Sequence, residues 1–307
     1  MDSTAAGEGG QVPLSTSTHF DRFLRNITLT ADERADATSR SNVVAKKLHE
    51  HFYPTTSYTG STKLLIGSHG KRTRVRPVRD VDLIFRIPGS TFLRFDDYSG
   101  NGQSALLQEI RGLLLARYPS TKVKGDGPVV VVPFTSGHTV EVLPAYYAED
   151  RDTYWIPNTR EGGSWMPSNY SAEFKYLDDS DRATNGQTRR LIKMMKVWQQ
   201  HCNVPIKSLC IELRAINFLS TWEHRGKTST WDDWMVRDYL AELIRYANGT
   251  CKIPGISEKC EYGDAWVSKA KTALRNAEEA CNYEGNDSDE AVAVYMWTKI
   301  FGDQYDE

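Results

Sequence analysis

Hydrophobic and polar positions follow two different periods over the first 150 residues. Within residues 31–52, apolar Val44, Leu48 and Phe52 recur every four positions, which predicts an amphipathic helix. Residues 104–118 predict a second helix. Short apolar runs between and after these helices predict strands, on which side chains repeat every two residues. The predicted strands are residues 63–67, 81–87, 129–132 and 139–143.

The pattern changes after residue 150. Residues 150–170 are rich in Pro, Gly, Asn and Ser, a composition typical of loops. Beyond them the sequence predicts mainly helices, at residues 186–201, 207–221, 233–247, 264–281 and 289–300. We therefore expect an α+β protein in which an α/β lobe precedes a helical lobe, with a cleft between them. The expected parts are a disordered tip (1–18), an α/β lobe that includes the long N-terminal helix (19–155) and a helical lobe (156–307).

The composition argues against several classes of protein. The 307 residues are 39% hydrophobic and 25% charged, as in an ordinary soluble globular protein. No stretch approaches the roughly 18–20 apolar residues that cross a bilayer, and the small, polar N-terminus does not resemble a secretory signal. We therefore expect a cytoplasmic protein with no membrane partner. A net charge of -2 gives the whole molecule no long-range attraction for nucleic acid.

The cysteines do not indicate a structural zinc site. There are five, all between residues 202 and 281, and no Cys-x-x-Cys occurs. A structural zinc site needs four ligands, usually supplied by close Cys/His pairs. The sequence therefore predicts ordinary reduced thiols in a reducing compartment. The five are Cys202, Cys210, Cys251, Cys260 and Cys281.

The candidate chemistry begins where the first strand ends. Gly67-Ser68 and Gly70 form a loop whose N–H groups and Ser68 hydroxyl can bind phosphate oxygens. Such Gly-Ser pairs are by themselves mostly turns. Five cationic residues follow this loop within nine positions. Taken alone, such a run would indicate a solvated basic loop. The five residues are Lys71, Arg72, Arg74, Arg76 and Arg79.

Two aspartates follow this basic run immediately. Asp80 and Asp82 lie on one face of a strand that is otherwise apolar, where two like charges are costly unless a cation lies between them. Carboxylate oxygens of this kind suit Mg²⁺. Glu141 is the best candidate for the third carboxylate of a two-metal site, because it too is an acid inside an apolar strand. Its competitors, Glu149, Asp150 and Asp152, lie in loop sequence.

At these residues the sequence resembles the polymerase-β-like nucleotidyltransferases. More narrowly, it resembles the bacterial relatives of cyclic GMP–AMP synthase and oligoadenylate synthetase, across about residues 40–220. The resemblance implies the polymerase-β-like lobe with a mixed sheet and a helical C-terminal lobe. Its Gly-Ser…Thr…Asp-x-Asp pattern and its later acid before Pro-Ala are matched by Gly67, Ser68, Thr73, Asp80, Asp82, Glu141, Pro144 and Ala145.

The helical half of the sequence agrees with this resemblance. Residues 189–198 resemble the family's basic helix that ends in Lys-x-Trp, and residues 207–213 resemble its Lys-Ser…Leu-Glu segment. On the first helix Arg189, Lys193 and Lys196 share a face. The resemblance makes Lys196 the best candidate for a phosphate-binding lysine and places Ser208 near the donor base or phosphates. It gives Glu212 a structural role.

The sequence also departs from the family. The third acid is Glu where Asp is commoner, and residues 165–170 match the base-contacting segment only loosely. The Cys/His zinc thumb of the animal DNA sensor is not found, so no DNA activator is expected.

By resemblance, the chain joins nucleoside triphosphates, ATP or GTP, without a template. We expect two Mg²⁺ ions, or Mn²⁺ in their place, to be bound by Asp80, Asp82 and Glu141. We expect the nucleotide to be bound by Gly67, Ser68, Lys71, Thr73, Lys193, Lys196 and Ser208. The product is a cyclic di- or trinucleotide that activates a separate effector in antiphage signalling (CBASS). Two alternatives remain open: a nucleotidyltransferase that modifies tRNA, protein or a small molecule, and an inactive nucleotide-binding module.

Overall fold

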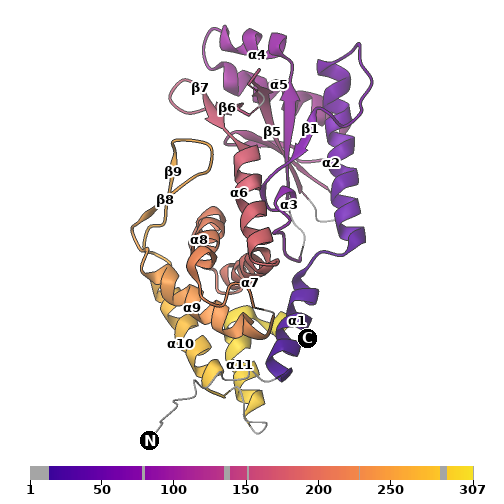
Figure 1. Ribbon diagram of the computed structural model, residues 1–307. Coiled ribbons are helices and arrows are strands. Elements are labelled where there is room, and N and C mark those ends of the chain that lie inside the picture. The colour runs from indigo at the N-terminus through magenta and orange to yellow at the C-terminus, as the bar shows by residue number, and fades with distance from the viewer. Residues whose placement is uncertain are drawn as a thin grey trace, which may run out of the picture. The chain divides into compact units, whose positions relative to one another are not determined.

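The computed structural model describes residues 14–77, 80–134, 139–150, 152–227, 229–283 and 289–306 (Figure 1). The chain forms two compact units. One contains residues 28–179 and 252–259, and the other contains residues 1–27, 180–251 and 260–307. The chain changes unit at 27/28, 179/180, 251/252 and 259/260. The first 13 residues of the expected tip lie outside the described part, and helix α1 begins at Leu14.

The first unit, residues 28–179 with 252–259, contains a mixed β-sheet. Its helices are α2 (Ala31–Phe52), α3 (Gly67–Gly70), α4 (Gly89–Asp96), α5 (Gly102–Arg117) and most of α6 (Tyr170–Ala183). Its strands are β1 (Lys63–Leu65), β2 (Asp80–Ile87), β3 (Lys124–Asp126), β4 (Val129–Pro133), β5 (Thr139–Tyr147), β6 (Tyr154–Asn158) and β7 (Ser164–Ser168). Among the described residues these seven strands form one sheet in the order β1-β2-β5-β4-β3, with β6 beside β5 and β7 beside β6.

The sheet confirms the expected mixed topology. Strands β2 and β5 are parallel, and the other pairings are antiparallel. A parallel pair needs a long crossover connection, and here the chain between β2 and β5 supplies α4, α5, β3 and β4. The predicted loop at residues 150–170 instead forms the β6–β7 hairpin. Tyr154 in β6 is buried, and Trp155 and Ile156 are good strand formers, so packing and propensity outweigh the prolines there.

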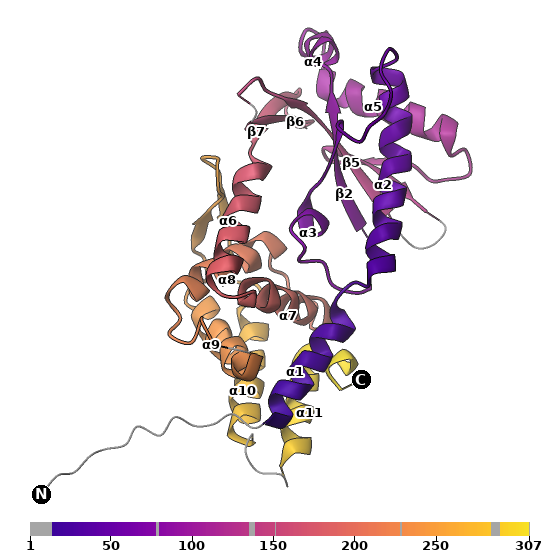
Figure 2. The same ribbon diagram turned by 45° about the vertical axis from the view of Figure 1, so that its right-hand side comes forward.

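Helix α2 matches its predicted bounds. Thr30 caps it, because its hydroxyl accepts from Glu33 N–H while the Glu33 side chain accepts from Thr30 N–H. Its predicted apolar face is buried and packs with α5 against β2 and β5. Figure 2 shows α2 running along the sheet. The odd-numbered β2 residues and the even-numbered β5 residues therefore point to this core, which includes Val81, Leu83, Val140 and Val142.

The other unit is helical, with a small hairpin. Its helices are α1 (Leu14–Ile27), the end of α6, α7 (Gln187–His201), α8 (Ser208–Thr221), α9 (Asp232–Ile244), α10 (Val267–Tyr283) and α11 (Glu290–Phe301), with short 3-10 turns at Ser229–Trp231 and Asp303–Tyr305. Strands β8 (Thr250–Lys252) and β9 (Lys259–Glu261) pair with each other. Segments from both ends of the sequence share its core, because Phe20 and Phe23 of α1 contact the rings of Trp297, Phe301 and Tyr305. No helix in the described ranges combines the length and hydrophobicity that a membrane span requires.

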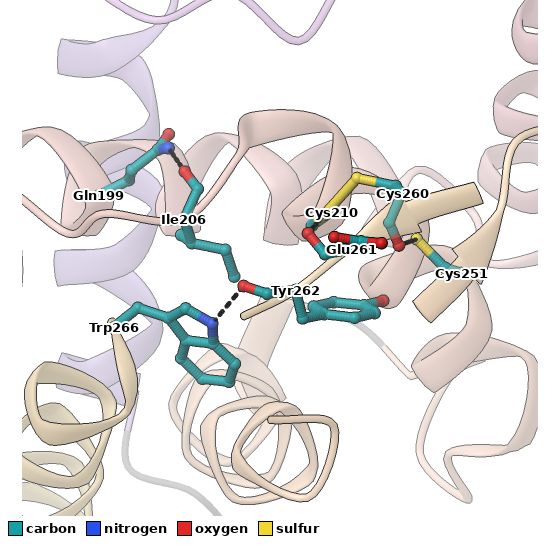
Figure 3. Close-up of a disulfide and its surroundings, with 8 residues drawn as sticks. All are labelled: Gln199, Ile206, Cys210, Cys251, Cys260, Glu261, Tyr262 and Trp266. Carbon is teal, nitrogen blue, oxygen red and sulfur yellow. Dashed lines mark hydrogen bonds between the residues drawn. A yellow bond between two sulfur atoms is a disulfide. The ribbon is translucent and has the colours of Figure 1, made fainter. Parts of the chain in front are cut away.

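The cysteine prediction is wrong for two residues. Cys210 of α8 and Cys260 of β9 form a disulfide (Figure 3). Cys202, Cys251 and Cys281 are not in disulfides. The pair is 50 residues apart in sequence, so spacing could not indicate it. Only the packing of the β8–β9 hairpin against α8 brings the two sulfurs together.

A core substitution tests the α2 packing. Replacing fully buried Leu48 by Ala removes apolar contacts and leaves a cavity, so we expect the free energy of unfolding to fall by about 2–5 kcal/mol. Urea denaturation followed by circular dichroism measures this. The matched control on the same helix is Val43→Ala, since Val43 is 44% exposed and its loss should change stability by less than about 0.5 kcal/mol. Equal effects of the two substitutions would contradict the assigned helix face.

Candidate functional site

The parallel pairing of β2 and β5 places the three predicted acids together. Asp82 lies directly beside Glu141 in the register, and Asp80 lies beside Thr139, two residues earlier on each strand. Adjacent strands are about 4.8 Å apart, and alternate residues share a face. All three carboxylates therefore project from one face of two neighbouring strands, the face opposite the α2–α5 core.

The strands hold these acids firmly because the residues between them are buried. Val81, Leu83, Val140 and Val142 are completely buried on the other face. A shift of either strand by one residue would bury the acids and expose the valines, so the register is strongly specified. The location of the acidic side chains thus follows from the apolar pattern of the same strands.

The electrostatics of Glu141 reflect this crowding. Burial raises its pKa above the ordinary value of 4.5, and the carboxylates of Asp82 and then Asp80 raise it further. Asp126 of β3 acts in the same direction, whereas Lys124 opposes it. A partly buried acid surrounded by acids is stabilised by a bound cation. In the other unit, the sulfur atoms of Cys210, Cys251 and Cys260 all lie within 4.8 Å of one another. The carboxylate oxygens of the triad are more widely spread than these sulfurs.

The predicted glycine loop packs directly against one of these acids. Gly67 begins the short helix α3 with φ +56°, and a β-carbon on it would lie 1.9 Å from an Asp82 carboxylate oxygen. The backbone joins the same two elements, since Ile66 N–H donates to the Asp82 carbonyl at 3.0 Å. Only glycine allows the loop to approach Asp82 so closely. No capping side chain bonds the first N–H groups of α3.

The other predicted residues of this loop differ in exposure. Ser68 is half-buried, and its carbonyl accepts from Thr73 N–H at 2.9 Å, which closes the loop. Thr73 is completely buried, so its hydroxyl belongs to the interior of the unit. Of the basic run, Arg76 donates to Glu33 of α2 at 2.9 Å, and Arg79 lies outside the described residues.

Lys71 has an acidic partner that sequence reasoning missed. Lys71 is 8% exposed, and its Nζ lies 2.7 Å from Oε2 of Glu173 in α6. Tyr170, one turn earlier on α6, interacts with Lys71, Glu173 and Asp82, and burial raises its pKa to about 12. The start of α6 therefore contributes to the surroundings of the triad. The sequence signal for the start of α6 is the capping residue Asn169, whose side chain accepts a hydrogen bond from Ala172 N–H at 2.9 Å.

The remaining predicted residues lie in the helical unit. Lys196 of α7 is 5% exposed, and its Nζ donates to Glu212 of α8 at 2.5 Å. Such a buried pair is stable because each charge compensates the other. Lys193 is half-buried on the same helix, and Ser208 begins α8, where its exposed hydroxyl donates to Gln199 at 2.8 Å. The structure thus supports the structural role expected for Glu212 and identifies its partner as Lys196.

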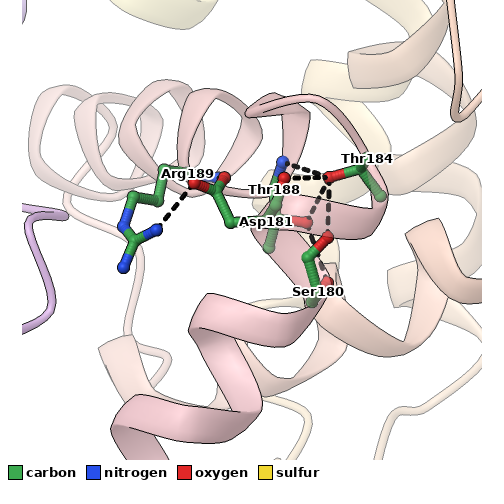
Figure 4. Close-up of polar contacts among 5 residues, drawn as sticks. All are labelled: Ser180, Asp181, Thr184, Thr188 and Arg189. Atoms are coloured by element: carbon green, nitrogen blue, oxygen red, sulfur yellow. Dashed lines mark hydrogen bonds and ion pairs between the residues drawn. The ribbon is translucent and has the colours of Figure 1, made fainter.

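Arg189, the first member of the predicted basic face, is held locally (Figure 4). Asp181, near the end of α6, accepts from Arg189 N–H at 2.8 Å and from its guanidinium at 2.6 Å. Beside this pair, the hydroxyls of Thr184 and Thr188 lie 2.9 Å apart. These bonds join the end of α6 to the first turn of α7. The predicted stripe of α7 therefore includes two cations, Arg189 and Lys196, that pair with acidic side chains.

The competitors for the third carboxylate lie in a turn. Asp150 accepts from the N–H groups of Asp152 and Thr153, each at 3.0 Å, and from the Thr153 hydroxyl at 2.8 Å. These bonds lower the pKa of Asp150. Its carboxylate shapes the β5–β6 connection. Glu149 and Asp152 belong to the same turn region rather than to the β2–β5 face.

Comparison with known proteins identifies the family. Residues 14–180, more than half of the chain, match the family model described as the Second Messenger Oligonucleotide or Dinucleotide Synthetase domain (SMODS). The chain belongs to this family. It is therefore an enzyme, a nucleotidyltransferase that makes oligonucleotide or dinucleotide second messengers, and the predicted family, fold class and reaction class are confirmed.

Individual relatives are distant in sequence but similar in fold. A probable cyclic nucleotide synthase of Bacillus cereus is 20% identical over 81% of this chain and 83% of the relative. CdnC of E. coli MS115-1, solved with ATP, has a TM-score of 0.70 at 19% identity, covering 94% of this chain and 98% of CdnC. Vibrio cholerae DncV, a cyclic AMP-GMP synthase solved with the linear intermediate pppA(3′,5′)pG, has a TM-score of 0.72 at 12% identity, covering 96% and 97%.

Nucleotidyltransferases of this fold use divalent metal ions. The residues present here fit that use. Three carboxylates supply the hard oxygen donors that Mg²⁺ prefers. Burial and then the repulsion of the neighbouring acids raise the pKa of Glu141, as expected of acids arranged to hold a cation.

The approach of Gly67 to Asp82 yields a first test of the site. We expect Gly67→Ala to displace Asp82 and to lower product synthesis from nucleoside triphosphates by about 100-fold, since misplacement by about 1 Å costs that much. The control is Gly127→Ala, because Gly127 has the same φ of +56° but no atom within 4 Å of its added β-carbon. Comparable activity of the two variants would show that the close approach is unimportant.

The raised pKa of Glu141 predicts a pH-dependent stability in metal-free protein. A carboxyl whose pKa is raised on folding stabilises the fold below its unfolded pKa, and that contribution is lost as the pH rises through the folded value. We therefore expect Glu141→Gln to raise the Tm in EDTA at neutral pH. The difference should shrink as the pH is lowered through the folded pKa of Glu141, because the wild-type side chain then becomes protonated as well. A lower Tm for the variant at neutral pH would contradict the described repulsion.

Proposed function

We propose that this chain condenses nucleoside triphosphates into a cyclic di- or trinucleotide and releases pyrophosphate. The proposal assigns the chemistry to Asp80, Asp82 and Glu141, which would hold two Mg²⁺ ions, with Mn²⁺ as a substitute. The observation that carries it is the β2–β5 register, which sets Glu141 beside Asp82 on the acidic face. Membership of a family of second-messenger synthetases supports the reaction class.

Each residue has a defined task in this mechanism. When bound, the divalent ions supply the positive charge that stabilises the reacting phosphate and lowers the pKa of the attacking ribose hydroxyl. The three carboxylates must be ionised to bind them, so protonation of Glu141 opposes ion binding. The raised pKa of Glu141 therefore predicts that activity falls on the acidic side at a higher pH than an ordinary glutamate would give.

We assign nucleotide-binding residues separately to the loop and to α7. We assign phosphate contacts to the N–H groups of Gly67 and Ser68 and to the Ser68 hydroxyl, with Thr73 closing the loop. We also assign Lys71, Lys193 and Lys196 to nucleotide binding. Because Lys71 pairs with Glu173 and Lys196 with Glu212, each acid would orient its lysine and limit the charge offered to phosphate. Ser208 would contact the donor nucleotide.

ATP and GTP are the substrates that we propose. CdnC has been solved with ATP, and DncV, a cyclic AMP-GMP synthase, with a linear intermediate that contains both bases. By analogy, a first in-line transfer would give a linear product and a second would close the ring. We also infer that the product activates a separate effector in antiphage defence, as the family resemblance implies.

The reaction is tested by supplying purified protein with labelled ATP, GTP, CTP and UTP plus Mg²⁺ or Mn²⁺. After phosphatase treatment, chromatography and mass spectrometry should reveal a resistant, cyclic product. Asp80→Asn/Asp82→Asn should lower its yield at least about 100-fold, because loss of transition-state charge stabilisation is worth about 10²–10³ in rate.

Asp152→Asn is the matched control, since this acid lies in the β5–β6 turn and only its backbone N–H is seen to bond Asp150. Its activity should remain that of the wild type. A phosphatase-sensitive product would show that the enzyme makes a linear oligonucleotide and does not close the ring. Labelling of tRNA or protein in place of a free oligonucleotide would overturn the proposal in favour of a nucleotidyltransferase with a macromolecular acceptor.

A further inference from the structure

Three cysteine sulfurs gather at one point in the helical unit (Figure 3). Cys210 is on α8, Cys251 is on β8 and Cys260 is on β9. Their sulfur atoms all lie within 4.8 Å of one another. Among the described residues this is the one group of three or more potential His, Cys, Asp or Glu ligands gathered so closely.

The hairpin geometry explains why two of the thiols are adjacent. Ile253 N–H donates to the Glu258 carbonyl at 3.2 Å, and Tyr262 N–H donates to the Gly249 carbonyl at 3.0 Å. This antiparallel register places Cys251 directly opposite Cys260, so their side chains leave the same face of the ribbon. That face packs against α8, where Cys210 supplies the third sulfur.

The cluster is buried and has a specific polar environment. All three cysteines are buried. Burial raises the pKa of the Cys251 thiol, while a hydrogen bond with the Tyr262 side chain and the Arg214 guanidinium act in the opposite direction. The Arg214 guanidinium also lies over the Tyr246 ring, 3.9 Å from its centre. Without a further cation, Cys251 is therefore a protonated thiol beside a cationic group.

A disulfide accounts for two of these residues but not for the third. Cys210 and Cys260 are bonded, and Cys251 remains a thiol whose sulfur lies 3.7 Å from the Cys260 carbonyl oxygen. Reduction of the disulfide by a dithiol, which gives up two electrons and two protons and is itself oxidised to a disulfide, would leave three thiols in the same place. Three buried thiolates repel one another unless a cation lies between them. Two sulfurs bound to one tetrahedral zinc ion, at about 2.3 Å each, are about 3.8 Å apart, which lies within the observed limit.

We propose that, after reduction of the Cys210–Cys260 bond, Cys210, Cys251 and Cys260 bind one thiophilic divalent cation, Zn²⁺, with water as the fourth ligand. The thiol protons are released to solvent as the sulfurs bind. The ion replaces the disulfide as the link between the β8–β9 hairpin and α8. This site is separate from the carboxylate triad, which offers oxygen donors in the other unit.

Cobalt titration tests the site without reference to catalysis. The purified protein, demetallated and reduced with a phosphine under argon, is titrated with Co²⁺. We expect one Co²⁺ per chain with the near-ultraviolet absorption of thiolate-to-cobalt charge transfer, which Zn²⁺ then abolishes at one equivalent. Zn²⁺ should also raise the Tm of the reduced protein, because an ion that binds only the folded state stabilises it.

Serine variants separate a metal site from a disulfide. Cys251→Ser keeps both disulfide partners but removes one ligand, so we expect Co²⁺ affinity to fall by about 100-fold and the Zn²⁺-induced rise in Tm to disappear. Cys281→Ser removes a thiol outside the cluster and should behave as the wild type. Circular dichroism confirms that each variant is folded, and Cys251→Ala provides a second truncation.

Two results would overturn the proposal. One is that reduced wild-type protein shows no thiolate–cobalt absorption. The other is that Cys251→Ser and Cys251→Ala retain this absorption at wild-type affinity, which would leave the cluster as a disulfide with a neighbouring thiol.

Discussion

The parallel pairing of β2 with β5 is the constraint on which the acidic face depends. It aligns Asp82 with Glu141 and places Asp80 two residues away along the same face. Neither strand could supply the triad alone, and a slip of one residue would destroy it. The pairing is maintained by the valines and leucines of the opposite face, which are buried under α2 and α5. Core packing and the arrangement of the acids therefore arise from one alternating pattern.

The energetic consequence is a site that is unfavourable until a cation binds. Burial and neighbouring acids raise the pKa of Glu141, and the loop at Gly67 packs tightly against Asp82. Nearby, Lys71 is paired with Glu173 of α6. Such a site gives up stability in the free protein in exchange for a defined position for divalent ions, a common relation between stability and function.

Much of this could be predicted from the sequence, because the signals were local. The α2 stripe and the alternation around Asp80–Asp82 indicated the fold class, and a Gly-Ser loop before Asp-x-Asp indicated the family. Contacts between distant segments could not be predicted. The pairing of Lys71 with Glu173, the disulfide of Cys210 with Cys260 and the packing of α1 beside α11 depend on tertiary structure. Helix α1 was nevertheless visible in principle, since Phe20, Phe23, Leu24 and Ile27 follow a helical period.

We propose that Asp80, Asp82 and Glu141 together bind the divalent ions, and that these ions in turn bind the substrate phosphates. The most direct measurement is a crystal structure of the wild-type protein with Mn²⁺ and a non-hydrolysable ATP analogue, recorded to show anomalous scattering. We expect manganese peaks coordinated by oxygens of all three carboxylates and of the triphosphate. Manganese bound elsewhere, or bound by the aspartates with Glu141 turned away, would contradict it.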